Sequence, residues 1–254
     1  MPARRDRLQR ALPDSRQENQ RTPEYHRAQA GAARLTQQQG GQPFNVSIST
    51  MLRATETADF VRAAFNEAGA VLVTAAGSHN VSADLMEMHF GDFEGLSADG
   101  NPFRDEYAKV TGAWSRGETS LRWPGEGGES PDDVAERGMA GLLSPAVLGT
   151  TESDTIVCVC HGRFNKIVLT KMLFDDVSKS TSSFRQNNTC MNVIDFDPVR
   201  HTFEAVAINS IEHLPLDVQV AELTKRLSQT PSWLSATPNS WQRSRWQSRS
   251  GGAE

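Results

Sequence analysis

The stretch Thr155–Phe174, TIVCVCHGRFNKIVLTKMLF, decides the fold class. Its apolar run from Ile156 to Cys160 predicts a strand that is buried on both faces, as in a parallel sheet. The run stops at His161 and Gly162, and a helix is predicted to follow, with its packing residues at Phe164, Ile167, Val168 and Leu169. His161 is thus expected at the carboxyl end of a strand and beside a helix N-terminus, where open α/β sheets bind ligands and anions are favoured. Either His161 is catalytic or binds an anion, or it merely ends a strand.

The composition narrows the classes of function. The chain has 254 residues, which suffices for one sizeable domain with tails or for two small domains. A net charge of −5 gives no basic field for nucleic acid, and no apolar run is long enough for a membrane helix. There is no secretion signal, and three cysteines are most simply reduced thiols. We therefore expect a cytoplasmic protein without nucleic-acid or membrane partners.

The sequence predicts a second strand that is followed directly by a helix, as at His161. The alternating residues 44–49 predict a strand, and small or apolar residues at helical spacing from Met51 to Ala68 predict the next helix, with Gly69 as its C-cap residue. Arg53 lies in the first turn of that helix, close to the carboxyl end of the preceding strand. A solvated surface charge is the alternative to an anion-binding role for Arg53.

Between these two units, residues 85–96 form an irregular, aromatic-rich segment that carries the acids Glu87, Asp92 and Glu94. A loop packed by its own aromatic rings can hold a carboxyl group in a partly dry site, as a general acid near neutral pH requires. The alternative is an ordinary surface loop.

The remaining segments complete a single predicted domain. Its further predicted elements are a buried strand over 70–75, a loop-rich region over 97–128, a helix that begins at Ser130-Pro-Asp-Asp133, a hairpin of strands over 191–196 and 202–208, and a closing helix near 216–228. We expect a polar N-terminal segment over 1–21, the domain over 22–228, and a disordered tail over 229–254. A tryptophan-containing binding peptide is the alternative for the tail.

Six segments, taken in order, resemble motifs of the histidine phosphatase superfamily, in its phosphoglycerate-mutase-like branch. They are TPEYHRAQA at 22–30, SISTMLRATETA at 47–58, LMEMHFGDFEGL at 85–96, GGES at 127–130, CHG at 160–162, and the pair NNT at 187–189 with NSIEHL at 209–214. The resemblance implies a three-layer α/β/α fold with a mostly parallel central sheet.

One motif of that family has no counterpart. The family opens with a strand and Arg-His-Gly, whose histidine becomes phosphorylated, whereas no His-Gly pair precedes His161 here. The match at Thr22 places the missing motif, and with it the first strand, upstream of Met1. Either the sequence is an N-terminally truncated version of an active phosphatase, or the chain has lost its nucleophile and kept the fold. We favour truncation, because losing a central strand leaves unpaired backbone groups, each costing about 1–3 kcal/mol.

The resemblance also implies roles for four residues. Arg53 would bind the phosphate with its planar fork, His161 and Gly162 would contact the phosphoryl group from the other side, and Glu87 would protonate the leaving oxygen. We therefore expect Arg53, Glu87 and His161 to meet at the carboxyl edge of the sheet. The resemblance implies no metal and no cofactor.

The expected activity is hydrolysis of a phosphomonoester, on a phosphorylated small molecule or a phosphoprotein. A catalytically inactive phosphate-binding protein or scaffold, and a phosphomutase, remain alternatives. The sequence leaves the substrate and the oligomeric state open.

Overall fold

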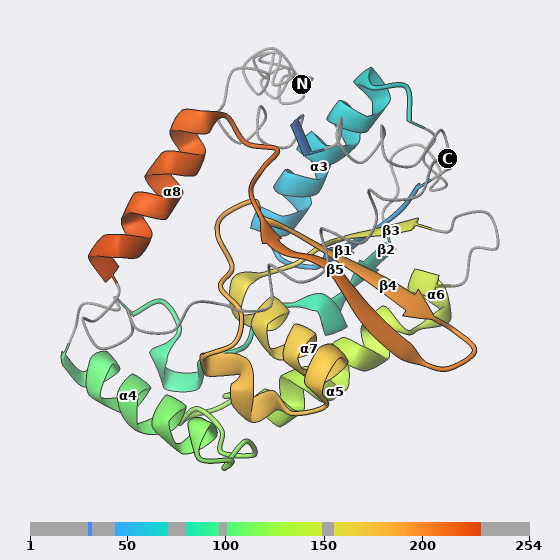
Figure 1. The fold of residues 1–254 in the computed structure, drawn as a ribbon. Coiled ribbons are helices and arrows are strands. Elements are labelled where there is room, and N and C mark those ends of the chain that lie inside the picture. Colours follow the sequence, from blue (N-terminus) through green and yellow to red (C-terminus); the bar gives the residue numbers. More distant parts are fainter. Residues whose placement is uncertain (1–29, 32–43, 71–79, 97–100, 149–154, 230–254) are drawn as a thin grey trace, which may run out of the picture. The chain divides into compact units, whose positions relative to one another are not determined.

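The computed structural model describes residues 30–31, 44–70, 80–96, 101–148 and 155–229 (Figure 1). Most of the helix predicted from Thr22, most of the strand predicted over 70–75, the N-terminal segment and nearly all of the tail lie outside these residues. By its internal contacts the chain divides at Leu214 into two compact units. The first unit holds all the strands of the described residues, and the second contributes α8, Leu216–Gln229, to the described part. The predicted domain boundaries stay predictions.

A three-stranded parallel sheet carries the fold. Strand β1, Phe44–Ser49, lies in the middle, between β2, Asn80–Ser82, and β3, Thr155–Val159. The register pairs Ile48 with Val81 on one side and with Val159 on the other, so the carboxyl ends of the strands meet at one edge. Helices lie on both faces of this sheet, which confirms the predicted α/β fold class (Figure 1).

Strand β1 is more deeply buried than its alternating sequence predicts. All six of its residues are buried, including the polar Asn45, Ser47 and Ser49. Its apolar face packs against α3, Leu52–Glu67, which begins and ends almost where the sequence predicts and has Gly69 just beyond its C-cap residue Ala68. The polar face meets the opposite layer, where the Asn45 side chain donates to the carbonyl of Val147 over 3.0 Å. The Asn45 side chain can therefore be buried here because it finds a partner.

Strand β3 shows the opposite deviation. The sequence predicts burial on both faces, but its residues are only partly buried and Cys158 is exposed. The reason lies in the sheet order, because β3 pairs with β1 along one edge and with no other strand among the described residues. The expectation of full burial was therefore wrong for the part of the chain that the structure describes.

The layer on the other side of the sheet from α3 contains two helices that pack against each other, α5, Pro131–Leu142, and α7, Gly162–Phe174 (Figure 1). The predicted start of α5 is confirmed by a capping box, in which the Ser130 hydroxyl accepts from the Asp133 amide and the Asp133 carboxylate accepts from the Ser130 amide. All four predicted packing residues of α7 are buried. The short helix α6, Pro145–Leu148, follows α5.

The region predicted to be loop-rich contains a long helix, α4, Asn101–Ser115. Its buried residues Val110, Ala113 and Trp114 follow helical spacing, and Val110 and Trp114 belong to the same core cluster as Trp123. The aromatic rings of Phe90 and Phe93 also pack against Trp123 in tilted orientations, with ring centres 5.2 and 5.8 Å from that of Trp123. The segment around Glu87 is therefore packed by its own aromatics, as predicted, with short 3-10 turns at Ala83–Leu85 and Gly91–Phe93.

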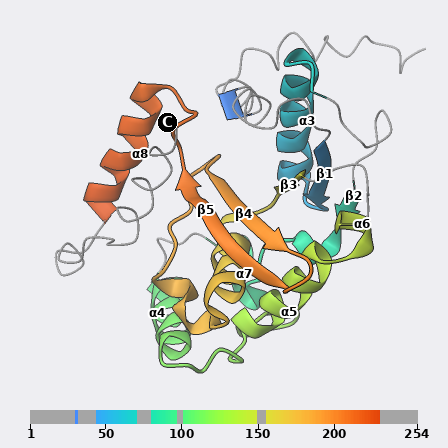
Figure 2. The ribbon, with the colours of Figure 1, turned by 45° about the vertical axis from the view of Figure 1, so that its right-hand side comes forward.

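The predicted hairpin is present and slightly longer than expected. Strands β4, Met191–Asp197, and β5, Thr202–Ser210, pair in antiparallel fashion. They form a two-stranded sheet of their own and do not join the parallel sheet within the described residues (Figure 2). A 3-10 turn at Val177–Thr181 follows α7 on the way to this hairpin.

Candidate active site

The carboxyl ends of β1 and β3 bring two of the predicted site residues into contact. Strand β1 ends at Ser49, and Arg53 follows in the first turn of α3. His161 lies two residues beyond the end of β3 and is the N-cap residue of α7. Because Ile48 and Val159 are neighbours in the parallel register, the turns after the two strands face each other. The Arg53 Nε atom donates to Nδ1 of His161 over 3.2 Å.

Both nitrogens of the His161 ring are engaged. Nε2 lies 2.8 Å from the Ser49 hydroxyl, which also accepts from the Met51 amide. Since a guanidinium can only donate, Nδ1 of His161 is the acceptor in its contact with Arg53, and the proton of the neutral ring sits on Nε2. The Ser49 hydroxyl and the Arg53 guanidinium therefore set the tautomer and the orientation of the imidazole.

The surroundings of His161 favour its neutral form. The ring is largely buried, with 6% of the residue exposed, and burial lowers the pKa of His161 below its ordinary 6.5. The Glu87 carboxylate acts in the opposite direction, while the Arg53 and Arg137 guanidinium groups lower the pKa further. An imidazole that is neutral near pH 7 can accept a proton or a hydrogen bond, whereas an anion bound beside it would favour protonation.

Glu87 lies at the N-terminus of α7 and not on the imidazole ring. Its Oε1 accepts from the Phe164 amide over 2.8 Å and from the Met88 amide over 3.1 Å, and its Oε2 accepts from the Arg163 amide over 3.2 Å. The Arg163 and Phe164 amides belong to the first turn of α7, which has no side-chain cap from its own N-cap residue. A carboxylate from a distant loop thus satisfies amides that a helix start leaves without partners.

Gly162 begins α7, next to His161. A side chain at this position would meet no atom within 4 Å, and its backbone does not adopt a positive φ. Neither steric crowding nor backbone conformation requires a glycine here, so any contribution of Gly162 to substrate binding would come from its backbone amide. The roles of Gly162, Arg53, Glu87 and His161 in substrate binding and catalysis stay predictions.

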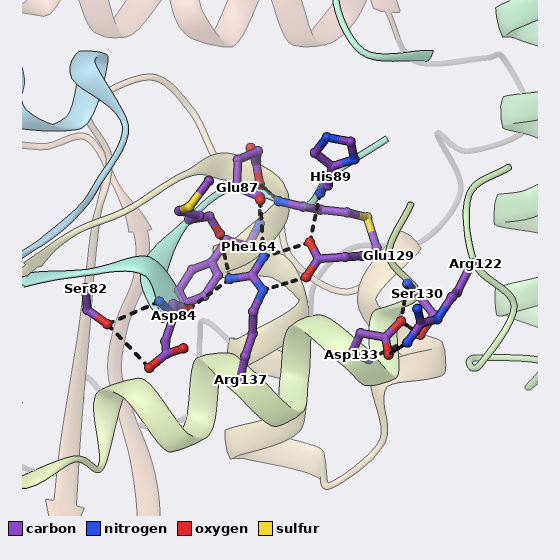
Figure 3. Close-up of polar contacts among 12 residues, drawn as sticks. Ser82, Asp84, Glu87, His89, Arg122, Glu129, Ser130, Asp133, Arg137 and Phe164 are labelled. Atoms are coloured by element: carbon purple, nitrogen blue, oxygen red, sulfur yellow. Dashed lines mark hydrogen bonds and ion pairs between the residues drawn. The ribbon is translucent and has the colours of Figure 1, made fainter. Parts of the chain in front are cut away.

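Sequence reasoning missed three residues that support this site. Ser49 lies inside a quoted motif, but nothing in the sequence says that its hydroxyl would meet His161. Glu129 and Arg137 form an ion pair with an N···O distance of 2.6 Å, and Arg137 also binds the backbone of the Glu87 loop (Figure 3). The GGES match could have drawn attention to Glu129, whereas Arg137 carried no signal.

The last two motif segments come together in a cluster of amide side chains. The Asn187 backbone amide donates to the Asn209 side-chain oxygen over 2.7 Å, and the Asn209 amide donates to Asn192 over 2.9 Å. Asn209 has a positive φ of 54°. Gln186 accepts from Asn192 and from Asn165 of α7, which ties the cluster to the helix that follows His161. These segments therefore brace the first turns of α7.

Other kinds of site find little support in the described part of the chain. There is no group of three or more His, Cys, Asp and Glu side chains suited to a metal ion among these residues. None of the helices described is long and apolar enough to cross a membrane.

Taken together, the edge offers an exposed guanidinium, a buried neutral imidazole, the first turn of a helix and a carboxylate. A guanidinium matches two oxygens of a phosphate at once, and an imidazole can add a third hydrogen bond. The arrangement is suited to binding a phosphoryl group, with a carboxyl group nearby that can exchange a proton.

Comparison with known proteins agrees with this reading. No curated protein sequence matches the chain significantly. Among solved structures, a mycobacterial glucosyl-3-phosphoglycerate phosphatase in complex with inorganic phosphate is similar over 74% of this chain and 87% of its own, with 24% identity and a TM-score of 0.51. The protein YhfR of Bacillus stearothermophilus matches over 76% and 86%, with 18% identity and a TM-score of 0.55. A phosphoglycerate mutase from Bacillus anthracis matches over 76% and 81%, with 18% identity and a TM-score of 0.52.

At these identities the structural matches show the fold alone. The family is shown by the sequence, since the family model of the histidine phosphatase superfamily (branch 1) matches residues 24–209 and so covers Arg53, Glu87 and His161. The chain therefore belongs to the histidine phosphatase superfamily, branch 1.

Proposed function

We propose that this chain is the greater part of a phosphatase that hydrolyses phosphomonoesters through a phosphohistidine. The observation that carries the proposal is the contact between Arg53 and His161 at the carboxyl edge of the parallel sheet. The substrate is a phosphorylated small molecule or a phosphoprotein, and the protein acts in the cytoplasm.

In this proposal Arg53 and His161 form the phosphate site. A doubly charged phosphate competes with the neutral imidazole for the guanidinium, and charge-assisted bonds to phosphate are the stronger ones. Arg53, which is exposed, turns its fork to two phosphoryl oxygens, while His161 stays fixed by Ser49 and donates to a third once it is protonated. Both contacts gain strength as charge develops on the transferring group.

The reaction has two steps. A histidine nitrogen attacks phosphorus, the P–O ester bond breaks, and the ester oxygen takes a proton from Glu87. Water then attacks the phosphohistidine and breaks its P–N bond, while Glu87 takes back a proton, and inorganic phosphate leaves.

The nucleophile in this proposal comes from a strand that is not part of the 254 residues. Support comes from β3, whose apolar residues are only partly buried and whose second edge pairs with no strand among the described residues. A strand laid along that edge would satisfy its backbone groups and bury Cys158. In a parallel orientation its carboxyl end would lie beside His161.

A second candidate is a phosphate-binding protein without turnover. The printed sequence favours it in one respect, since it contains no Arg-His-Gly. In that case Arg53 and His161 hold an anion and no covalent intermediate forms.

The experiment compares two chains on a generic aryl phosphate. One is the 254-residue chain, and the other is extended by the upstream coding sequence, provided that this encodes a strand ending in Arg-His-Gly. We expect background turnover from the first and turnover higher by orders of magnitude from the second, because removing a nucleophile closes the covalent route. Arg53→Ala in the extended chain controls for contaminating phosphatases and should abolish most of the turnover.

Two outcomes would contradict the proposal. Turnover by the 254-residue chain that depends on Arg53 would mean that the nucleophile lies within it. An upstream sequence without such a strand, together with binding of vanadate that Arg53→Ala abolishes, would favour the phosphate-binding protein.

A further inference from the structure

Arg137 in the middle of α5 uses all of its hydrogen-bonding capacity (Figure 3). Its Nε and Nη2 donate to the two carboxylate oxygens of Glu129 over 2.6 and 2.9 Å. Nη1 donates to the carbonyls of Asp84 and Met86 over 2.8 and 2.9 Å, and Nη2 donates to the carbonyl of Glu87 over 3.1 Å. These five bonds match the five N–H donors of a guanidinium.

Glu129 holds the same segment from its other end. Its Oε2 accepts from the His89 amide over 2.8 Å, and its own backbone amide donates to the His89 carbonyl over 3.0 Å. The side chains of Glu129 and Arg137 are each about four-fifths buried, at 19% and 20% exposure. A bidentate pair of this kind is more rigid than a surface ion pair.

The segment 86–90 depends on such outside partners. It lies between two 3-10 turns and belongs to no strand or helix, so its backbone groups have no ladder of their own. Carbonyls in a partly buried segment need donors, and Arg137 donates to two of them, those of Met86 and Glu87, as well as to the carbonyl of Asp84 in the preceding turn. A residue of α5 therefore fixes the first part of this segment, while Glu129 holds it at His89.

Glu87 is held from two sides as a result. Its carbonyl accepts from Arg137 of α5, while its carboxylate accepts from the first amides of α7. The two helices are themselves in close contact, and the Arg137 guanidinium lies 5.7 Å from the centre of the Phe164 ring. The main chain of Glu87 thus has a defined position relative to the turn that carries His161.

We propose that Arg137, locked by Glu129, is a positioning residue that holds Glu87 at a fixed distance from His161. The inference rests on the proposed function, in which Glu87 is the proton donor. A residue that only stabilised the fold would be replaceable without changing how strongly Glu87 and His161 influence each other.

The test is a double-mutant cycle that reads the pKa of His161 by NMR in the 254-residue chain. The charged groups that face His161 are Glu87, Arg53 and Arg137. Glu87→Gln removes a negative charge and should lower the His161 pKa in the wild-type background. In the Arg137→Met background the same change should have less than about half of that effect, since the cycle cancels the direct charge of Arg137 and leaves only the coupling.

Arg122→Met is the matched control. Arg122 also pairs with a carboxylate, that of Asp133 at the start of α5, but its side chain is 64% exposed and, among the described residues, forms no hydrogen bond or ion pair with the segment 84–89. The effect of Glu87→Gln on His161 should be unchanged in that background. Should Arg137→Met fail to fold, Glu129→Gln takes its place, because it keeps the side-chain shape and weakens the lock on Arg137.

An undiminished effect of Glu87→Gln in a folded Arg137→Met chain, or in Glu129→Gln where that variant is needed, would overturn the proposal. The readout needs no turnover, so it stays decisive even if the chain proves to be a phosphate-binding protein. In an extended chain that is active, Arg137→Met should lower kcat by a larger factor than it raises KM, because it displaces a proton donor and leaves Arg53 in place.

Discussion

Strands β1 and β3 lie side by side in one register, yet the more polar of the two is the more deeply buried. Strand β1, FNVSIS, alternates apolar and polar residues and is buried at all six positions. Strand β3, TIVCV, is apolar at four of its five positions and is only partly buried. The difference follows their neighbours, because β1 pairs on both edges and β3 pairs on one among the described residues.

The comparison shows that the burial of a strand depends on its place in the sheet more than on its own sequence pattern. Polar atoms on β1 are accommodated where a partner exists, as Asn45 and Ser49 show, although the Ser47 hydroxyl finds no hydrogen-bond partner among the described residues. Apolar atoms on β3 stay accessible because nothing described covers that edge. The two strands also supply the two halves of the site, with Ser49 and Arg53 after β1 and His161 after β3.

A matched pair of truncations tests the comparison most directly. Val46 of β1 and Val157 of β3 are partners in the register, and Val46 is 1% exposed whereas Val157 is half-buried. Val46→Ala should lower the free energy of unfolding by about 1.5–3 kcal/mol, and Val157→Ala by about half as much or less. Denaturant unfolding of the 254-residue chain measures both.

The same two substitutions also test the proposal that a further strand pairs with the second edge of β3. In a chain extended by a strand that pairs with β3, the cost of Val157→Ala should rise toward that of Val46→Ala. Equal costs already in the 254-residue chain would refute the contrast between the two strands.

Helix α7, which follows β3 and carries His161 at its start, packs closely against α5 at Gly138. A Cβ on Gly138 of α5 would lie 2.6 Å from Val168 and 2.9 Å from Phe164 of α7. Gly138→Ala should therefore cost about 1–2 kcal/mol net, since overpacking outweighs the gain of about 1 kcal/mol in helix propensity. Thermal or denaturant unfolding measures the change.

Gly112 of α4 provides the control for this substitution. Its Cβ would make only an ordinary contact of 3.5 Å, with the end of the flexible Arg116 side chain. Gly112→Ala should be neutral or should stabilise by up to about 1 kcal/mol. If the two substitutions had the same sign, close packing of α5 on α7 would not be the deciding effect.

The capping box of α5 should have a smaller effect on the same side of the molecule. Burial by itself would raise the pKa of Asp133, but the Ser130 hydroxyl and amide and the Arg122 guanidinium hold it below its ordinary value. Ser130→Ala should cost about 1 kcal/mol at neutral pH. The cost should shrink in acid, because a lowered folded pKa contributes stability that is lost as the pH falls below the ordinary 3.8.

Urea unfolding at neutral and acidic pH tests this expectation. Ser115→Ala on the exposed side of α4 is the control, since its hydroxyl bonds only to the Thr111 carbonyl and to the hydroxyl of the partly buried Thr181. A pH-independent cost of Ser130→Ala would mean that the Asp133 carboxylate takes no part in the cap.

The smallest effect concerns the hydrogen bond that joins the two strand ends. His161 contacts Ser49 and Arg53, and its folded pKa lies below the ordinary 6.5 mainly because it is buried. The unfolded chain then binds more protons in the pH range below 6.5, so the free energy of unfolding should fall as the pH drops through that range. The contribution is fully present above pH 6.5.

Unfolding between about pH 7.5 and about pH 5 in the wild type and in His161→Gln tests this sign. The variant should lose less stability over that range than the wild type. A wild-type protein that became more stable in acid through His161 would show that Glu87 dominates the surroundings of the ring.

The sequence by itself determined the elements whose signal is local. The apolar run before His161, the helical stripe after Met51 and the turn signals at Ser130 each predicted an element that the structure contains. Motif order also pointed to Arg53, Glu87 and His161 as residues of one site. These inferences hold because periodicity, capping and turn chemistry act over a few residues and can be read from one segment at a time.

Tertiary structure alone decided what depends on partners far along the chain. It buried the polar face of β1 and left β3 half-exposed, and within the described residues it kept the hairpin β4–β5 out of the parallel sheet. It placed the Glu87 carboxylate on amides 76 and 77 positions away, and it brought the Arg137 guanidinium to carbonyls about fifty positions away. No periodicity encodes such contacts, because a donor and an acceptor that meet only after the helices pack leave no pattern in either segment.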